Sequence, residues 1–420
     1  MEQRKQRHHR GMRPWIAGTT MANTEKKGPL EGLKVLDLTR VLAGPFATMW
    51  LAAMGADVIK VENPNDGDVT RQYGPFINDR SSYFPTVNHN KKGITLNMKA
   101  EEGRELFRKL AADADVVVEN FRPGVMENLG LGYEDLRKIN PGIIYASISG
   151  YGTYGPYRNR PGYDVTAQGM SGIMFLTGQM DGPPTRVGSS IGDTIAGIDI
   201  VVAILAAIYC RNRTGKGQKV ETSLVDSLIS LSTQDYIRFF AAGEVPCRMG
   251  NIYKSWAPYG TYRASDGYYN LGCGTEEHFR KFARGIGQRW MPDDERFSSH
   301  ALRVAYRDEL DAYINEWAQD KTVAQICDLM LQAGVPCAPV NSIVEISKDE
   351  HIAGAREMFP VLDQPGMVPY RVTNIPVRFS ESGLAPVLPA PEFGGDNDDI
   401  YGALGKTAEE LKVLREKGVI

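Results

Sequence analysis

The chain has 420 residues, of which 42% are hydrophobic and 24% charged, and its net charge is −3. Such a composition is typical of a folded globular protein of two or three domains. The small net charge gives no reason to expect nucleic acid or an anionic membrane as a partner, and we expect neither.

Residues 1–28 differ from the rest of the chain, because basic side chains surround His8 and His9 and no apolar stretch follows. That pattern is not a secretory signal. We expect a disordered tail, whether it is an appended tag, an extension before Met21 or an organelle-targeting arm.

From residue 33 onward, apolar strands alternate with helices. Strands are predicted over 34–38, 57–62, 115–119 and 143–148, with helices between them over 43–54, 101–112 and 133–139. Repeated β-α-β units indicate a parallel sheet with right-handed crossovers, covered by helices on both faces. Because ligands bind beyond the carboxyl ends of such strands, we expect the chemistry in the loops that follow them.

Residues 150–192 are rich in Gly, Pro, Tyr and Asn and predict a long irregular stretch of the kind that often carries function. An apolar helix over 195–210 and a strand over 219–224 come next. Beyond about residue 240, a hairpin with a D-G turn and three later helices predict a smaller α+β domain. These helices are expected near 276–287, 302–318 and 321–333.

The five cysteines are odd in number and form no C-x-x-C pair, which argues against a disulfide framework or a zinc ribbon. This usage is typical of a reducing compartment, so we expect a cytoplasmic protein. The six histidines show no metal-ligand spacing, and no metal site is expected. No uninterrupted apolar run reaches the roughly 18 residues of a membrane span. Asp199, which interrupts 195–210, is expected to be a satisfied buried or interface residue and not a catalyst.

The P-loop motif G-x-x-x-x-G-K-[ST] is absent from the sequence, which argues against a P-loop nucleotide-binding protein. Residues 88–92 (NHNKK) are either a solvated basic turn or a phosphate site. Residues 120–124, just after a strand, favour ligand contact, while Gly162-Tyr163-Asp164 has the pattern of a turn.

Asp193 stands at the mouth of the apolar helix. Aspartate is a preferred N-cap, so a purely structural role is one interpretation. The other is a nucleophile, because the dipole and the N–H groups of a helix N-terminus lower the pKa of a carboxyl group and keep it ionised. An ionised carboxylate in a dry pocket can attack a carbonyl carbon, and the two roles are compatible.

At these residues the sequence resembles the family III CoA-transferases. That group includes formyl-CoA and carnitine CoA-transferases, succinyl-CoA-dependent dicarboxylate enzymes and α-methylacyl-CoA racemases. The resemblance runs from about residue 29 to the C-terminus. Its segments are 33–45 (LKVLDLTRVLAGP), 55–62 (GADVIKVE), 118–124 (VENFRPG), 145–151, 160–164 (RPGYD), 191–194 (IGDT), 214–218 (TGKGQ) and 334–340 (GVPCAPV).

The resemblance implies an α/β fold with a Rossmann-like parallel-sheet large domain, a smaller α+β domain and an interlocked, ring-like homodimer. Residues 29–224 would begin the large domain, 225–335 would form the small domain with its linkers, and 336–420 would complete the large domain. The implied partners are small molecules, an acyl-CoA and a carboxylic acid. Coenzyme A is thus a substrate, and no tightly bound cofactor is implied.

The resemblance also implies the site. Asp193 matches the family's nucleophile, with Tyr163 and Asp164 in support. The positions implied to contact CoA are Val41, Ala43, Leu96, Asn97, Met98, Lys99, Asn120, Phe121, Arg122 and Tyr163. We assign Arg40 to the distal carboxylate of the acceptor acid, beside Leu42. Backbone N–H groups near Gly192 or in 256–260 are candidate donors to the tetrahedral oxyanions.

Two departures from the family bear on the reaction. Racemases have a histidine where Tyr163 stands, so a transferase is favoured over a racemase-like isomerase. Formyl-CoA enzymes have a glutamine at the position of Leu42 and a long glycine-rich loop in place of 256–259, so oxalate or formate chemistry is disfavoured. The pattern is closer to enzymes that use succinyl-CoA and dicarboxylates. A non-catalytic CoA-binding protein is the third hypothesis.

Overall fold

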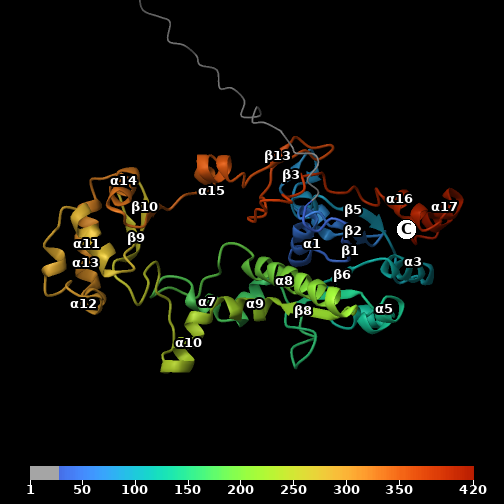
Figure 1. The fold of residues 1–420 in the computed structure, drawn as a ribbon, viewed down its shortest axis with the longest axis horizontal. Coiled ribbons are helices and arrows are strands. Elements are labelled where there is room, and N and C mark those ends of the chain that lie inside the picture. Colours follow the sequence, from blue (N-terminus) through green and yellow to red (C-terminus); the bar gives the residue numbers. More distant parts are fainter. Residues whose placement is uncertain (1–27) are drawn as a thin grey trace, which may run out of the picture.

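A six-stranded parallel sheet forms the centre of the larger unit, in the order β5-β2-β1-β6-β7-β8 (Figure 1). The structure is a computed structural model that describes residues 28–420, so the expected disordered tail lies outside the described residues, apart from Gly28. The strands are β1 (Lys34–Asp37), β2 (Asp57–Glu62), β5 (Lys92–Thr95), β6 (Val116–Glu119), β7 (Ile144–Ser149) and β8 (Lys219–Ser223). Every neighbouring pair is parallel, which confirms the predicted α/β sheet.

Helices cover both faces of this sheet, because its strands are apolar on both sides. One face packs against α1 (Ala43–Ala53) and α8 (Ile191–Thr214). The other packs against α3 (Glu101–Ala112), α5 (Tyr133–Ile139), α16 (Asn397–Ala403) and α17 (Ala408–Glu416). The C-terminal segment therefore returns to the sheet, where the Asn97 N–H donates to the carbonyl of Val419 at 2.8 Å.

A smaller unit lies apart from this sheet (Figure 1). Its antiparallel sheet has the order β11-β10-β9, and its helices enclose a separate apolar core around Phe279, Phe282 and Ile314. The elements are β9 (Tyr259–Arg263), β10 (Tyr268–Gly272), β11 (Cys337–Pro339), α11 (Glu276–Gly285), α12 (His300–Ala305), α13 (Arg307–Ala318) and α14 (Val323–Ala333). The predicted hairpin and helices are present, with the expected helix over 302–318 divided at Tyr306. The small sheet takes its third strand, β11, from the segment that was expected to return to the large unit.

Short elements connect these units. The helices are α2 (Tyr83–Asn88), α4 (Val125–Asn128), α6 (Asp164–Met170), α7 (Ile173–Leu176), α9 (Leu224–Leu231), α10 (Thr233–Ala242) and α15 (Ile343–Ile346). The remaining elements are β3 (Phe76–Ile77), β4 (Arg80–Ser81), β12 (Val361–Leu362), β13 (Tyr370–Arg371), η1 (Val69–Gln72), η2 (Met291–Asp293) and η3 (Glu350–Ala355). The stretch 150–192 is thus less irregular than expected, because α6 and α7 lie in it.

Helix α8 is longer than the predicted 195–210. It has 24 residues and, within residues 28–420, is the one helix long and apolar enough to cross a membrane by length and composition alone. Asp199 interrupts its apolar run, so the expectation that no uninterrupted apolar run reaches about 18 residues is not contradicted. In the fold, Ala196, Ile200 and Ile204 are buried in the core beside the sheet, where a soluble protein's central helix would also place them.

Candidate active site

A pocket of about 290 Å³ opens at the carboxyl ends of β1, β6 and β7, where the sheet topology predicts ligands. Three loops and the start of α8 form its wall. The lining residues are Arg40, Val41, Leu42, Ala43, Asn120, Phe121, Arg122, Pro123, Ile148, Ser149, Gly150, Arg158, Arg160, Pro161, Gly162, Tyr163, Asp193 and Leu224. The structure thus brings together Asp193, Tyr163, both substrate-side positions and five of the positions expected to contact CoA.

The remaining predicted positions lie elsewhere. Leu96 is buried in the core, and Asn97 is held by the C-terminal segment through its backbone and side chain. Met98 packs partly buried against the same core, and Lys99 is exposed. None of these four residues lines the pocket around Asp193.

Asp193 is the third residue of α8, in its first turn. The N-cap is Ser190, and no side chain makes a capping hydrogen bond at this end of the helix. The interpretation of Asp193 as the helix cap is therefore wrong. The carboxylate lines the pocket and has no hydrogen-bond partner within residues 28–420 to hold it in a structural role.

The electrostatics of Asp193 also differ from expectation. Burial, followed by the negative charge of Asp164, raises the pKa of Asp193 to about 7. The helix N-terminus was expected to lower this pKa, but burial has the larger effect. Loss of hydration destabilises the charged carboxylate more than the helix N-terminus stabilises it. Near neutral pH the Asp193 carboxyl group is therefore partly protonated and partly ionised. Catalytic acids and bases commonly have pKa values in this range.

We therefore expect kcat/KM to rise with pH through about 7, because only the ionised Asp193 can act as a nucleophile. Substitution of Asp164→Asn removes one charge that raises this pKa, so the rising limb should move to lower pH. A pH–rate profile of both proteins measures the shift. A wild-type profile that stays flat well below neutral pH would contradict the raised pKa.

Asp164 acts through the backbone of α8. It is buried, and its Oδ1 accepts the N–H of Gly192 at 2.8 Å. Its Oδ2 accepts from Nε2 of Gln168 at 2.8 Å, and Oε1 of Gln168 accepts the N–H of Val187 at 2.9 Å. Asp164 and Gln168 thus tie α6 to both sides of the turn that presents Asp193. The Gly192 N–H is already used, so it is not the expected oxyanion donor, and residues 256–260 do not line this pocket.

Positive charge gathers around Asp193. Arg40, Arg122, Arg158 and Arg160 line the pocket, and Asp193 is the only carboxylate among its lining residues. Arg158 and Arg160 lie on the exposed loop after β7, and neither was assigned a role from the sequence. The phosphates of CoA and the carboxylates of acids are anions that such a wall attracts.

Tyr83 is a second residue that sequence reasoning missed. Burial and the nearby charge of Asp193 raise its pKa to about 12, so its hydroxyl stays protonated as a hydrogen-bond donor. Its ring contacts that of Tyr73 edge to face, with centroids 6.0 Å apart. No local motif singles out this tyrosine, because Asp193 lies far away in the sequence.

Lys91 is a structural residue, contrary to both interpretations of residues 88–92. Its side chain is 0% exposed and pairs with Asp37 at 2.9 Å. Its Nζ also donates to Oγ1 of Thr48 and to Oδ1 of Asn88, both at 2.8 Å. A buried ammonium with these partners is neither solvated nor available to a phosphate. Asp199, in turn, is satisfied as expected, because it accepts from Oγ of Ser227 at 2.6 Å.

Gly150 and Gly162 bring the two ends of the loop after β7 together. A Cβ added at Gly150 would lie 2.8 Å from Cα of Gly162, a backbone atom that cannot move without its loop. We expect Gly150→Ala to displace the loop that carries Tyr163 and to lower kcat/KM by roughly ten- to a hundredfold. Steady-state kinetics measure the loss. Gly274→Ala, with nothing within 4 Å of the added carbon, is the matched control and should leave kcat/KM unchanged.

Comparison with known proteins agrees with this geometry. The family model described as CoA-transferase family III matches residues 30–397. An acetyl-CoA:oxalate CoA-transferase of Acetobacter aceti is 42% identical over 78% of this chain and 84% of its own. The succinyl-CoA:glutarate CoA-transferase of Mus musculus is 38% identical over 91% of this chain and 88% of its own. The crystal structure of a CAIB/BAIF family protein from Brucella suis has a TM-score of 0.80 and 39% identity, and covers 90% of this chain and 100% of that one.

Proposed function

Because the chain belongs to CoA-transferase family III and is therefore a CoA-transferase enzyme, we propose that Asp193 carries the reaction as a covalent nucleophile. The donor is succinyl-CoA and the acceptor a dicarboxylic acid. The observation that carries this proposal is a carboxylate, tuned to neutral pH, at the wall of a pocket that four arginines line. No observation favours the racemase-like alternative, and Tyr163 stands where racemases have their histidine.

The proposed reaction has two symmetrical halves. An Asp193 oxygen attacks the donor thioester carbonyl, the C–S bond breaks, and CoA thiolate leaves a mixed anhydride. The thiolate attacks the aspartyl carbonyl, which releases the donor acid and leaves a CoA thioester on Asp193. The acceptor carboxylate then attacks that thioester, the C–S bond breaks, and CoA thiolate leaves as a second anhydride forms. The thiolate resolves it at the acceptor carbonyl, which gives the new acyl-CoA and frees Asp193.

Water must be kept from these intermediates, since every one of them hydrolyses. The partly buried position of Asp193 supports the proposal, because the same loss of water that raises its pKa also protects its acyl forms. Tyr83 is a candidate donor to the tetrahedral oxyanion, because its hydroxyl stays protonated near the carboxylate.

Arg40 is our candidate for the distal carboxylate of the acceptor. Its guanidinium lies 5.5 Å from the centroid of the Phe121 ring, and its backbone is fixed by Asn120. Dicarboxylates fit this assignment, since one carboxylate reacts while the other binds the guanidinium. The relatives named above act on oxalate or on glutarate at similar identity, so the length of the acceptor is a matter for experiment.

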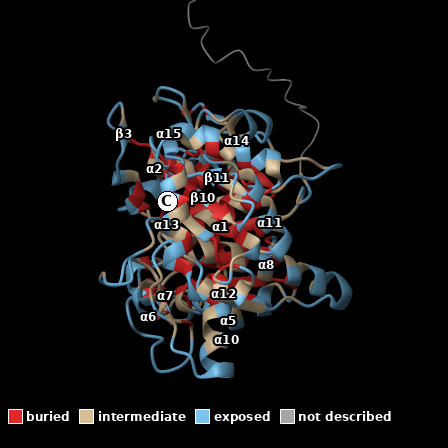
Figure 2. Cartoon of the chain, turned by 90° about the vertical axis from the view of Figure 1, so that its left-hand side faces the viewer, coloured by how far each residue is buried: buried red, intermediate tan, exposed pale blue. Residues whose placement is uncertain are grey.

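The other parts of the proposal concern CoA and the assembly. Val41, Ala43, Asn120, Phe121, Arg122 and Tyr163 would contact CoA. For Leu96, Asn97, Met98 and Lys99, which do not line this pocket, contact with CoA stays a prediction. We also propose an interlocked homodimer with the large and small domains divided as above. Helix α10 has no buried residue (Figure 2), and Phe240 on α10 and Ile343 on α15 are 74% and 87% exposed. Exposed apolar side chains of this kind mark interaction surfaces.

The location that we propose is the cytoplasm, because the five cysteines of the protein are free thiols, as is usual in a reducing compartment.

A screen of acid acceptors against succinyl-CoA and acetyl-CoA, read by mass spectrometry, tests the proposed substrates. We expect the fastest transfer from succinyl-CoA to dicarboxylic acids. Faster transfer from acetyl-CoA to oxalate would overturn this choice and leave the chemistry of Asp193 in place. Deuterium exchange at Cα of a 2-methylacyl-CoA tests the isomerase alternative, and we expect none above background.

A further inference from the structure

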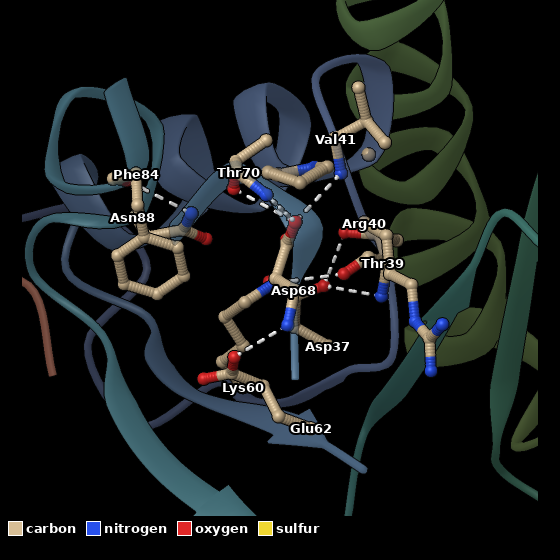
Figure 3. A network of polar contacts seen from close by, with 12 residues as sticks. Asp37, Thr39, Arg40, Val41, Lys60, Glu62, Asp68, Thr70, Phe84 and Asn88 are labelled. Carbon is tan, nitrogen blue, oxygen red and sulfur yellow. Dashed lines mark hydrogen bonds and ion pairs between the residues drawn. The ribbon is translucent and has the colours of Figure 1, made fainter. Parts of the chain in front are cut away.

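The backbone of residues 39–41, in the loop that carries Arg40 into the pocket, is held by side chains of β1, of β2 and of two other loops (Figure 3). The Thr39 N–H donates to Oδ1 of Asp37 at 2.9 Å, and its carbonyl accepts from Nζ of Lys60 at 2.8 Å. Asn120 holds both the N–H and the carbonyl of Arg40, each at 2.8 Å. The Val41 N–H points at Oδ1 of Asp68, 3.4 Å away.

This loop needs such support, because Val41 has a φ of 68°. A β-branched residue rarely adopts that left-handed conformation, in which its Cβ crowds the backbone. Strain of this kind persists only where the surroundings over-determine the conformation, and it is concentrated at functional sites. In an unsupported loop Val41 would return to a negative φ, and the direction of the neighbouring Arg40 and Leu42 would change with it.

Lys60 and Asp68 hold the two ends of the strained turn, at Thr39 and Val41. Their side chains are 0% exposed and pair at 3.0 Å. Asp68 is itself fixed, because its Oδ1 accepts the N–H and the hydroxyl of Thr70 at 3.0 and 2.8 Å. Neither Lys60 nor Asp68 lines the pocket.

We propose that Lys60 and Asp68 are positioning residues that keep Val41 left-handed and so direct Arg40 and Leu42 toward the substrates. The inference rests on the proposed role of the pocket, and goes beyond it by naming what sets the pocket's shape. A pair that served stability alone could be replaced by apolar side chains of similar size with little loss. This pair differs, because both of its members also bond to the backbone of the pocket loop.

The test replaces the pair without leaving a buried charge. In Lys60→Met/Asp68→Leu the loop loses its bonds from Lys60 to Thr39 and from Val41 to Asp68. We expect kcat/KM to fall by up to about a hundredfold, mostly through an increase in KM. Adding Val41→Gly should recover part of that loss, because glycine adopts a positive φ without a Cβ to crowd. If the pair served stability alone, Val41→Gly would not restore kcat/KM in the double variant.

The matched control is Lys92→Met/Asp57→Leu. It removes an exposed pair, 2.9 Å apart, that joins the same strand β2 to its neighbour β5, and it should leave the kinetics unchanged. If the buried double variant fails to fold, Asp68→Asn keeps the oxygen that faces Val41 but weakens the hold on Lys60. It should then raise KM by a smaller factor.

Binding of CoA itself, measured by calorimetry, separates this inference from the proposed mechanism. The dissociation constant should rise in the double variant and recover with Val41→Gly, whether or not Asp193 forms a covalent intermediate. A folded double variant with wild-type kcat/KM and wild-type CoA affinity would overturn the inference. So would a loss that Val41→Gly does not reduce.

Discussion

Substitution of Asp193→Asn is expected to lower kcat by at least about a thousandfold, since loss of a catalytic nucleophile removes the covalent route altogether. The amide has nearly the same shape as the carboxylate, and Asp193 makes no capping bond that the fold needs. The variant should therefore stay folded and bind CoA. Because the folded protein must hold a carboxyl group whose pKa is raised to about 7, stability falls as pH rises from the unfolded value toward 7, and the neutral amide should relieve that cost.

Three measurements check this expectation together. Steady-state kinetics give the loss in kcat, calorimetry gives the CoA affinity, and urea denaturation gives the stability at neutral pH. Hydroxylamine added during turnover should convert Asp193 of the wild type to its hydroxamate and leave the variant unmodified. Asp181→Asn, at an exposed position in the preceding loop, is the control and should react as the wild type does. Full turnover by Asp193→Asn would remove Asp193 from the mechanism.

Substitution of Asp37→Ala is expected to lower the free energy of unfolding by about 3–5 kcal/mol, the usual cost of breaking a buried ion pair from one side. Asp37 and Lys91 are both 0% exposed. Asp37 also accepts from Thr39 and Thr48, so its loss leaves several buried donors without a partner. Denaturation by urea, followed by circular dichroism, measures the change.

The pH dependence of this loss follows from Lys91. Burial lowers the pKa of Lys91 to about 8, below the value of an exposed lysine, even with Asp37 beside it. The unfolded chain therefore binds more protons above pH 8, and stability rises with pH over that window. In Asp37→Ala the lysine folds in its neutral form already below pH 8, so the deficit should shrink as the pH rises toward 8 and stay constant above it. Asp57→Ala breaks an exposed pair and should cost less than about 1 kcal/mol at every pH. An equal loss in the two variants would contradict the role of burial.

The central sheet could be predicted because its information is local. Each strand is a short apolar run, and each helix between strands is amphipathic or apolar over its whole length. The start of α8 was missed for the opposite reason. Its first turn contains Gly192 and Asp193, weak helix formers by propensity, and a contact from Asp164, 28 residues earlier, satisfies the buried N–H of Gly192, which has no partner within the helix. Such a tertiary contact leaves no pattern in the local sequence.

The site was predictable where residues follow strand ends. Arg40 and Asn120 come from loops that the parallel topology brings to one edge of the sheet, where Asp193, in the first turn of α8, joins them. Lys91 was misjudged because two lysines in a row look solvated, while its partner Asp37 lies 54 residues away. The pKa of Asp193 was misjudged because burial depends on how much of the pocket wall surrounds the carboxylate, and no sequence pattern measures that.

The most direct test follows an oxygen atom from the acceptor acid to Asp193. With an acceptor labelled by heavy oxygen in its carboxylate, the proposed steps leave one labelled oxygen on Asp193 after each turnover. In each later turnover the donor acid leaves with the Asp193 oxygen that attacked it, so label also passes into the donor acid. Mass spectrometry of the peptide that contains Asp193 should find the label there, and in the released donor acid. Label in the donor acid with none on Asp193, while product forms, would mean direct transfer between the two acids and would contradict a covalent role for this aspartate.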